Sequence, residues 1–184
     1  MGAALGRLWQ RVMGLRAFRV LMLGLDYSGK TTLLYRLSLG ETVRTIPTIG
    51  FNVETLRHGA SSIVMWDLGY QEKLVPLWRH YYQGATGLIF VIDSSDSDRL
   101  PEAKAVLQKL LRDDELRRLP LLVLANKQDL PNSLAHAQVA TELALQSLVD
   151  RPWYVQGSCG CTGAGLEEGL GWLVQLMVRS PIAR

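Results

Sequence analysis

The sequence is poor in cysteine and has no long hydrophobic run. Its 184 residues include two cysteines, Cys159 and Cys161, which are too few and too close together for a disulfide framework. No apolar stretch approaches the roughly 18 residues that a membrane-spanning helix needs, and no charged-then-apolar leader with a cleavage site opens the chain. We therefore expect a reduced, cytoplasmic protein, long enough for one globular domain with a full core.

Positive charge is concentrated at the N-terminal end. The net charge is +3, yet the first 25 residues contain four arginines and no acidic residue, while the remaining residues contain 16 basic and 17 acidic side chains. The body of the protein is therefore not a basic domain, which argues against nucleic-acid binding. The distribution instead predicts that the N-terminal segment meets an anionic surface.

Apolar segments alternate with amphipathic ones along the rest of the chain. The segments expected to be strands are 18–24, 51–57, 61–67, 87–93, 120–126 and 153–158, and those expected to be helices are 31–39, 100–111, 135–148 and 166–178. This alternation predicts an α/β fold with a parallel sheet covered on both faces. Residues 51–67 read as a hairpin. The boundary falls near residue 17, between an N-terminal arm (1–17) and the domain (18–184).

A phosphate-binding motif follows the first predicted strand. Residues 24–31, Gly-Leu-Asp-Tyr-Ser-Gly-Lys-Thr, satisfy the pattern G-x-x-x-x-G-K-[ST] and precede a predicted helix. Glycines allow backbone N–H groups to wrap a phosphate, and the helix N-terminus adds a positive dipole end. Lys30 would reach the β- and γ-phosphates, and the Thr31 hydroxyl would ligate Mg²⁺. A Gly-rich turn without a ligand is the structural alternative.

Two further motifs follow later strands. Asp67 ends an apolar strand, where its carboxylate would hold the metal through water. Asn126, Lys127 and Asp129 follow the strand that ends near residue 125. A carboxylate at Asp129 would accept the N1–H and the exocyclic N–H of guanine, a pattern that adenine lacks, so it argues against an ATP-using phosphotransferase. Asn126 would tie this loop to the phosphate loop, and the Lys127 stem would cover the base.

Together these residues resemble the Arf and Arf-like family of small GTPases over nearly the whole chain. The resemblance includes residues 24–32, 45–52 (Thr-Ile-Pro-Thr-Ile-Gly-Phe-Asn), 66–69 (Trp-Asp-Leu-Gly), Gln71-Glu72, 125–129 and Gly165-Leu166. It implies a P-loop NTPase fold with a six-stranded, mostly parallel sheet and helices on both faces, and it implies GTP/GDP cycling. It also implies that Thr48 joins Thr31 on Mg²⁺ in the GTP state and that Gln71 orients the attacking water.

The motifs and the resemblance together predict a role for each residue of the site. The predicted catalytic residues are Gln71 and Lys30, and the predicted metal ligands are Thr31, Thr48 and Asp67. The residues predicted to bind the nucleotide are Gly24, Asp26, Tyr27, Ser28, Gly29, Lys30, Thr31, Thr32, Thr48, Gly69, Tyr70, Asn126, Lys127, Asp129, Cys159 and Gly160. Of these, Cys159 and Gly160 match the family's loop beside guanine, where a backbone N–H meets O6.

Tyr70 departs from the family pattern, which has a second glycine after Gly69. Glycine there gives the following segment its backbone freedom, so a tyrosine would be strained if the position needs a positive φ in either nucleotide state. One hypothesis is a GTP-binding interaction module with impaired hydrolysis or switching. The alternative is a loop that accommodates Tyr70 by turning it outward. Tyr27 is a second bulky residue at a position where the family often has a small one. Its side chain would lie over the nucleotide or point into solvent.

The N-terminal arm has an apolar stripe at helical spacing. The stripe consists of Leu5, Leu8, Trp9, Val12 and Met13. It would contact a membrane surface, and the structural alternative is that it packs permanently on the domain. Gly2 allows N-myristoylation. The resemblance implies a monomer that associates reversibly with membranes in trafficking or signalling, with an exchange factor, a GTPase-activating protein and effectors as partners. The effectors would read an apolar patch formed by Phe51, Trp66 and Tyr81.

Overall fold

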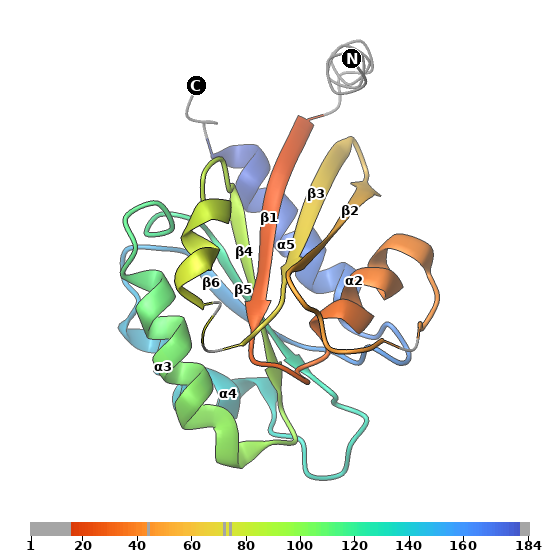
Figure 1. Ribbon diagram of the computed structural model, residues 1–184, viewed down its shortest axis with the longest axis vertical. Helices are drawn as coiled ribbons and strands as arrows, with labels where there is room; N and C mark the ends of the chain where they lie inside the picture. The colour runs from red at the N-terminus through yellow and green to blue at the C-terminus, as the bar shows by residue number, and fades with distance from the viewer. Residues whose placement is uncertain (1–15, 44, 72, 74, 181–184) are drawn as a thin grey trace.

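Six strands form one sheet in the computed structural model, which describes residues 16–43, 45–71, 73 and 75–180 (Figure 1). They are β1 (Arg16–Gly24), β2 (Phe51–His58), β3 (Ser61–Leu68), β4 (Gly87–Asp93), β5 (Leu121–Asn126) and β6 (Trp153–Gly157). The order across the sheet is β2-β3-β1-β4-β5-β6. The β2–β3 pair is antiparallel and the other pairs are parallel. The predicted six-stranded, mostly parallel sheet and the predicted hairpin are confirmed.

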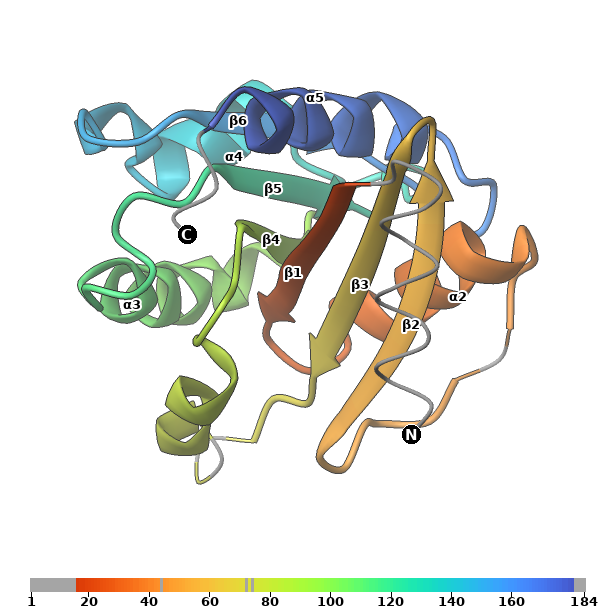
Figure 2. The ribbon, with the colours of Figure 1, turned by 90° about the horizontal axis from the view of Figure 1, so that it is seen from above.

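Helices cover both faces of the sheet. Figure 2, which looks at the molecule from above, shows α2 (Lys30–Leu39) and α5 (Leu166–Arg179) on one side and α3 (Leu100–Leu111) on the other. The shorter α4 (His136–Glu142) packs with α3. Single-turn 3₁₀ segments lie at Ser97–Arg99 and Leu145–Ser147, and a longer 3₁₀ helix spans Val75–Tyr81. No helix within the described residues is long and apolar enough to cross a membrane.

The strands alternate their side chains between two cores. In β1, Leu21 and Leu23 belong to the cluster that includes residues of α3 and α4. Val20 and Met22, which point the other way, belong to the cluster that includes residues of α2 and α5. All four are buried. A central parallel strand that is apolar on both faces is the expected result of helices on both sides, and it holds the carboxyl end of β1 firmly where the phosphate loop begins.

The structure departs from the predicted elements in two places. The helix expected over 135–148 is interrupted, because α4 ends at Glu142 and Ala144 adopts a left-handed φ of 54° before the 3₁₀ turn. This break allows both Leu143 and Leu145 to be buried, whereas two positions along a continuous helix differ by about 200° around its axis. The 3₁₀ helix Val75–Tyr81 was not predicted. The predicted arm (1–17) lies almost entirely outside the described residues.

Candidate nucleotide-binding site

The phosphate loop connects β1 to α2 and closely approaches the loop after β5. Gly29 has a φ of 93°, and a Cβ atom at this position would lie 2.4 Å from the Asn126 Nδ2 atom. The Asn126 side-chain amide donates a hydrogen bond to the Ser28 carbonyl at 2.9 Å. Glycine is therefore required here both by the backbone conformation and by the proximity of Asn126. The tie between the two loops that the sequence predicts is present.

Lys30 lies buried at the start of α2. Its Nζ atom donates to the Leu25 carbonyl at 2.6 Å. Burial lowers the pKa of the ammonium to about 8, although the nearby charges of Asp67 and Asp26 raise it in part. A bound phosphate would favour the charged form of Lys30, because its negative charge would offset the solvation that burial takes from the ammonium.

Two threonines and an aspartate converge beside Lys30. The Thr31 hydroxyl donates to the Asp67 Oδ2 atom at 2.7 Å and lies 2.8 Å from the Thr48 hydroxyl. The Asp67 side chain is completely buried, and its Oδ1 atom has no hydrogen-bond partner among the described residues. Hydroxyl and carboxylate oxygens are the ligands that Mg²⁺ prefers. The orphaned buried oxygen and this donor set therefore fit the predicted magnesium site.

Asn52 is a member of this cluster that the sequence did not reveal. Its side-chain amide donates to Asp67 Oδ2 at 3.2 Å and lies 3.3 Å from the Thr48 hydroxyl. The contact follows from the antiparallel register, which pairs Asn52 of β2 directly with Asp67 of β3. The sequence predicts the hairpin, but its register depends on cross-strand packing.

The segment after β3 packs tightly against the segment before β2. The Gly69 N–H donates to the Gly50 carbonyl at 2.9 Å, and a Cβ atom at Gly69 would lie 2.3 Å from the Thr48 carbonyl oxygen. On the other side, the buried Trp78 indole N–H donates to the Gly69 carbonyl at 3.2 Å. Any side chain at position 69 would push away the backbone that presents Thr48 to Asp67.

Tyr70 is turned toward α3. Its hydroxyl donates to the Glu102 Oε1 atom at 2.9 Å, and its ring centroid lies 6.0 Å from that of Trp78. Tyr70 is not among the non-glycine residues with positive φ, so the strain considered from the sequence does not arise in this conformation. The side chain is half-buried rather than pointing outward into solvent. Gln71 follows it and is exposed.

A cleft brings most of the predicted residues together. It is lined by Asp26, Tyr27, Gly29, Lys30, Thr31, Thr32, Thr45, Ile46, Pro47, Thr48, Gly69, Tyr70, Gln71 and Lys127. Gly24, Ser28, Asp67 and Asn126 are among the predicted residues outside this lining, and Ser28, Asp67 and Asn126 are buried. Tyr27 has a φ of 58°, and its side chain is 71% exposed. The predicted catalytic residues Lys30 and Gln71 thus share one cleft.

The predicted guanine-binding residues lie in two adjoining loops. The Cys159 thiol donates to the Asp129 carboxylate at 3.2 Å, which fixes the orientation of an otherwise exposed side chain. The Lys127 ammonium binds Asp93. Burial favours a raised pKa for Asp93, but the hydrogen bonds from Lys127 and Ser95 together lower it. The Gly160 N–H, expected to be available for guanine O6, donates here to the Asn126 Oδ1 atom at 3.1 Å.

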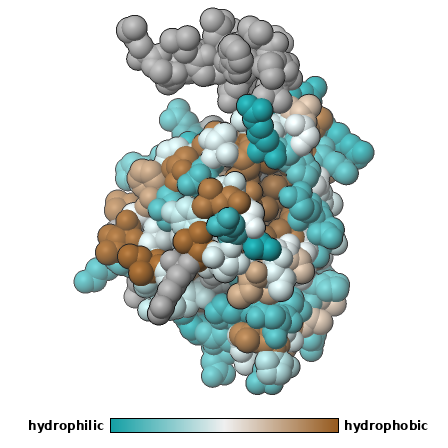
Figure 3. All heavy atoms as spheres, turned by 90° about the vertical axis from the view of Figure 1, so that its right-hand side faces the viewer, coloured by the Kyte–Doolittle hydropathy of each residue, from teal (hydrophilic) through white to brown (hydrophobic). Residues whose placement is uncertain are grey.

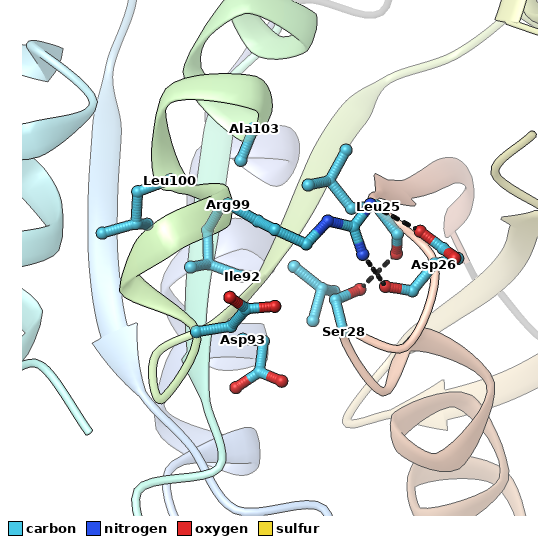
Figure 4. A pocket seen from close by; sticks show the side chains of 10 residues that line it. Leu25, Asp26, Ser28, Ile92, Asp93, Arg99, Leu100 and Ala103 are labelled. Atoms are coloured by element: carbon cyan, nitrogen blue, oxygen red, sulfur yellow. Dashed lines mark hydrogen bonds and ion pairs between the residues drawn. The ribbon is translucent and has the colours of Figure 1, made fainter. Parts of the chain in front are cut away.

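Asp26 points away from the interior of the phosphate loop. Its carboxylate binds the Arg99 guanidinium at 2.7 Å, and Arg99 also donates to the Asp26 carbonyl at 3.4 Å (Figure 4). Arg99 lies immediately before α3, at its N-cap position. A predicted nucleotide contact from Asp26 therefore rests on its backbone, because its carboxylate is already paired.

Three aromatic rings form a cluster beside this site. The ring centroids of Phe51, Trp66 and Tyr81 lie 5.2 to 5.7 Å apart. The Arg19 guanidinium lies 4.0 Å from the Trp66 ring centroid on a cation–π contact. Phe51 remains 46% exposed, and the neighbouring Ile46 and Ile49 are more than 80% exposed. Figure 3 shows hydrophobic side chains gathered in patches on the side of the molecule that carries α2 and β2.

This fold and this site define a P-loop GTPase. The model of the ADP-ribosylation factor family matches residues 5–177 of the chain. Among solved structures, the chain is similar to the Arl6 (BBS3) small GTPase of Trypanosoma brucei with the bound nucleotide analogue GppNp. The two are 34% identical with a TM-score of 0.82, over 90% of this chain and 99% of that chain. The chain belongs to the ADP-ribosylation factor family, whose members are GTP hydrolases, and is a GTP-binding switch protein.

Proposed function

We propose that this protein is a monomeric, Mg²⁺-dependent switch GTPase that hydrolyses GTP slowly and, when bound to GTP, recruits effectors at membranes. The observation that carries the proposal is the convergence of Thr31 and Thr48 on Asp67, whose second carboxylate oxygen is buried without a described partner. These three residues would hold Mg²⁺, which supplies positive charge to the phosphates. Thr48 would join Thr31 on the metal in the GTP state, and the 2.8 Å between their hydroxyls supports this assignment.

Positioning and charge are the catalytic resources of such a site. Lys30 would offset negative charge on the phosphates, and Gln71 would orient the attacking water from the same cleft. The Arg99 guanidinium touches the phosphate loop but is bound by Asp26 and Glu102. Arg99 therefore offers no free cation to the γ-phosphate. An arginine supplied by an activating protein would accelerate hydrolysis, which is why we expect the intrinsic rate to be slow.

Single-turnover hydrolysis tests the enzymatic part. GTP-loaded protein should hydrolyse its nucleotide with Mg²⁺ and stop when EDTA removes the metal. Gln71→Leu, which removes the water-orienting amide, should slow hydrolysis at least about tenfold while GTP remains bound. Gln108→Leu, a matched change at an exposed position of α3, should leave the rate unchanged. Equal rates in wild type and Gln71→Leu would contradict the assigned role.

A second function is a GTP-binding interaction module with little turnover. Tyr70 favours it, because the family's glycine is replaced by a side chain that lines the cleft beside Gln71 and is fastened to Glu102. Tyr70→Gly separates the two functions. A large rise in single-turnover hydrolysis would favour the module, whereas an unchanged rate would favour the cycling switch.

The membrane part rests on the N-terminal arm and Gly2, which lie outside the described residues. The protein would be cytoplasmic and would attach reversibly to a membrane through an acyl chain and the amphipathic helix together. Myristoylated protein should float with anionic vesicles more strongly in the GTP form than in the GDP form, and Gly2→Ala should abolish flotation. Equal flotation in both nucleotide states would contradict a membrane switch.

Phe51→Ala should weaken effector capture by the aromatic cluster without changing nucleotide binding.

A further inference from the structure

A continuous chain of polar contacts runs from Tyr70 to the phosphate loop. The Tyr70 hydroxyl donates to Glu102 Oε1 at 2.9 Å, and the Arg99 Nε atom donates to Glu102 Oε2 at 2.9 Å. The other end of the same guanidinium binds Asp26 at 2.7 Å. Arg99 Nη2 also donates to Glu102 Oε1 at 3.3 Å, so both carboxylate oxygens accept from Arg99 and one of them also accepts from Tyr70. The N-terminal end of α3 thus links the segment after β3 to the phosphate loop.

Glu102 is a charged and well-placed acceptor. It lies in the first turn of α3, three residues after Arg99, so the two side chains share one face. The hydrogen bond from Arg99 lowers the pKa of Glu102 despite some burial, and the bond from Tyr70 lowers it further. The Tyr70 hydroxyl thus donates to a carboxylate ion, and such charge-assisted bonds are stronger than bonds between neutral groups.

Tyr70 in turn belongs to the backbone that presents Thr48. Its neighbour Gly69 donates to the Gly50 carbonyl and lies directly against the Thr48 carbonyl. Thr48 brings its hydroxyl to Thr31 in this same arrangement. A contact that fixes residue 70 on α3 therefore also favours the position of Thr48 at the metal site. A glycine at position 70 would have no side chain with which to make that contact.

We propose that Tyr70 and Glu102 form a latch that holds residues 69–71 on α3 and thereby favours the GTP-bound over the GDP-bound arrangement. Glu102 is a positioning residue that acts through Tyr70, and Arg99 keeps it oriented. The proposal rests on the proposed function, because it assigns the arrangement with Thr48 at the metal site to the GTP state. Tyr70 is then a device for longer-lived GTP binding, whatever its effect on the hydrolysis rate.

Dissociation rates of two nucleotides test the latch. Tyr70→Phe keeps the ring beside Trp78 and removes only the hydroxyl. We expect a non-hydrolysable GTP analogue to dissociate about three- to tenfold faster from this variant, with GDP dissociation changed less than about twofold. Glu102→Ala should reproduce the effect, and the double variant should add little to either single change. The controls are Tyr154→Phe, which removes an exposed hydroxyl on β6, and Glu168→Ala in the first turn of α5.

Hydrogen exchange separates failure of the latch from failure of the proposed function. In nucleotide-free protein, Tyr70→Phe should increase amide exchange over residues 69–82 relative to wild type and to Tyr154→Phe. Unchanged exchange, equal acceleration of both nucleotides or additive effects of the two substitutions would overturn the latch. Wild-type protein that binds GTP and GDP without any dependence on Mg²⁺ would overturn the proposed function, and the exchange result would still decide whether Tyr70 holds the segment.

Discussion

The Asn126 side-chain amide donates to the Ser28 carbonyl at 2.9 Å and so joins the two loops that would hold opposite ends of the nucleotide. Its oxygen accepts from the Gly160 N–H at 3.1 Å and lies 3.4 Å from the Ser158 hydroxyl. The residue is almost completely buried. One side chain thus connects three loops. Its loss should therefore weaken the binding of the phosphates and of the guanine together.

Asn126→Ala should therefore accelerate dissociation of GDP and of GTP by a similar factor. The truncation leaves the Ser28 carbonyl and the Gly160 N–H without their partner, at a cost of about 1–3 kcal/mol for each buried group that stays unpaired. We expect at least about a tenfold faster release, measured with a fluorescent nucleotide and an excess of unlabelled competitor. Asn132→Ala, at an exposed loop position, is the matched control. Acceleration of one nucleotide alone would show that Asn126 does not serve as a common brace.

Asp129→Asn should change which base the protein prefers. A carboxylate accepts both N–H groups of guanine, whereas an amide offers one acceptor and one donor. Xanthine has a carbonyl in place of the exocyclic amine and matches that arrangement. We expect GDP affinity to fall roughly 10- to 100-fold, as for one lost charge-assisted bond, and xanthosine diphosphate affinity to rise. Competition binding measures both, with Asp150→Asn as control. An unchanged preference would remove Asp129 from the base site.

The phosphate loop, the Asp67 strand and the guanine loop could be predicted from the sequence because each is a local pattern with a fixed chemical purpose. Strand ends of a parallel sheet meet at one edge, so the order of the motifs also predicts that they meet. Asn52 could not be predicted as a member of the site, because it reaches Asp67 through the register of β2 and β3. The orientation of Tyr70 likewise depends on Glu102, 32 residues away.

Local sequence patterns also do not predict the interruption after α4 or the 3₁₀ helix at Val75–Tyr81. Propensity favours a continuous helix through Leu143, and the burial of both Leu143 and Leu145 overrides it. In the segment that contains Trp78, burial of one indole ring and its bond to the Gly69 carbonyl define the structure. Both cases are tertiary packing that the apolar periodicity of a short segment does not reveal.

Nucleotide binding should take up a proton near pH 8. Burial lowers the pKa of Lys30 to about 8 in the absence of nucleotide, and phosphate charge would raise it in the complex. Below pH 7 the ammonium is charged in both states and no proton is taken up through it. Near pH 8 about half a proton should be taken up, so affinity should fall as the pH rises further. Calorimetry of GDP binding in buffers of different ionisation enthalpy measures this. Lys30→Arg, whose guanidinium stays charged, should lose the effect, and no uptake by wild type at pH 8 would contradict it.

Trp78→Phe should destabilise the protein and loosen the segment after β3. Phenylalanine fills part of the indole's buried volume but cannot donate to the Gly69 carbonyl, which the indole N–H reaches at 3.2 Å. Loss of that bond and of packing should lower the free energy of unfolding by about 2 kcal/mol, measured by urea denaturation of the GDP-loaded protein. Trp172→Phe, at a half-buried ring that stacks near Tyr154, should cost less than about 1 kcal/mol. Equal losses in the two variants would mean that neither the bond to Gly69 nor the deeper burial of Trp78 adds stability.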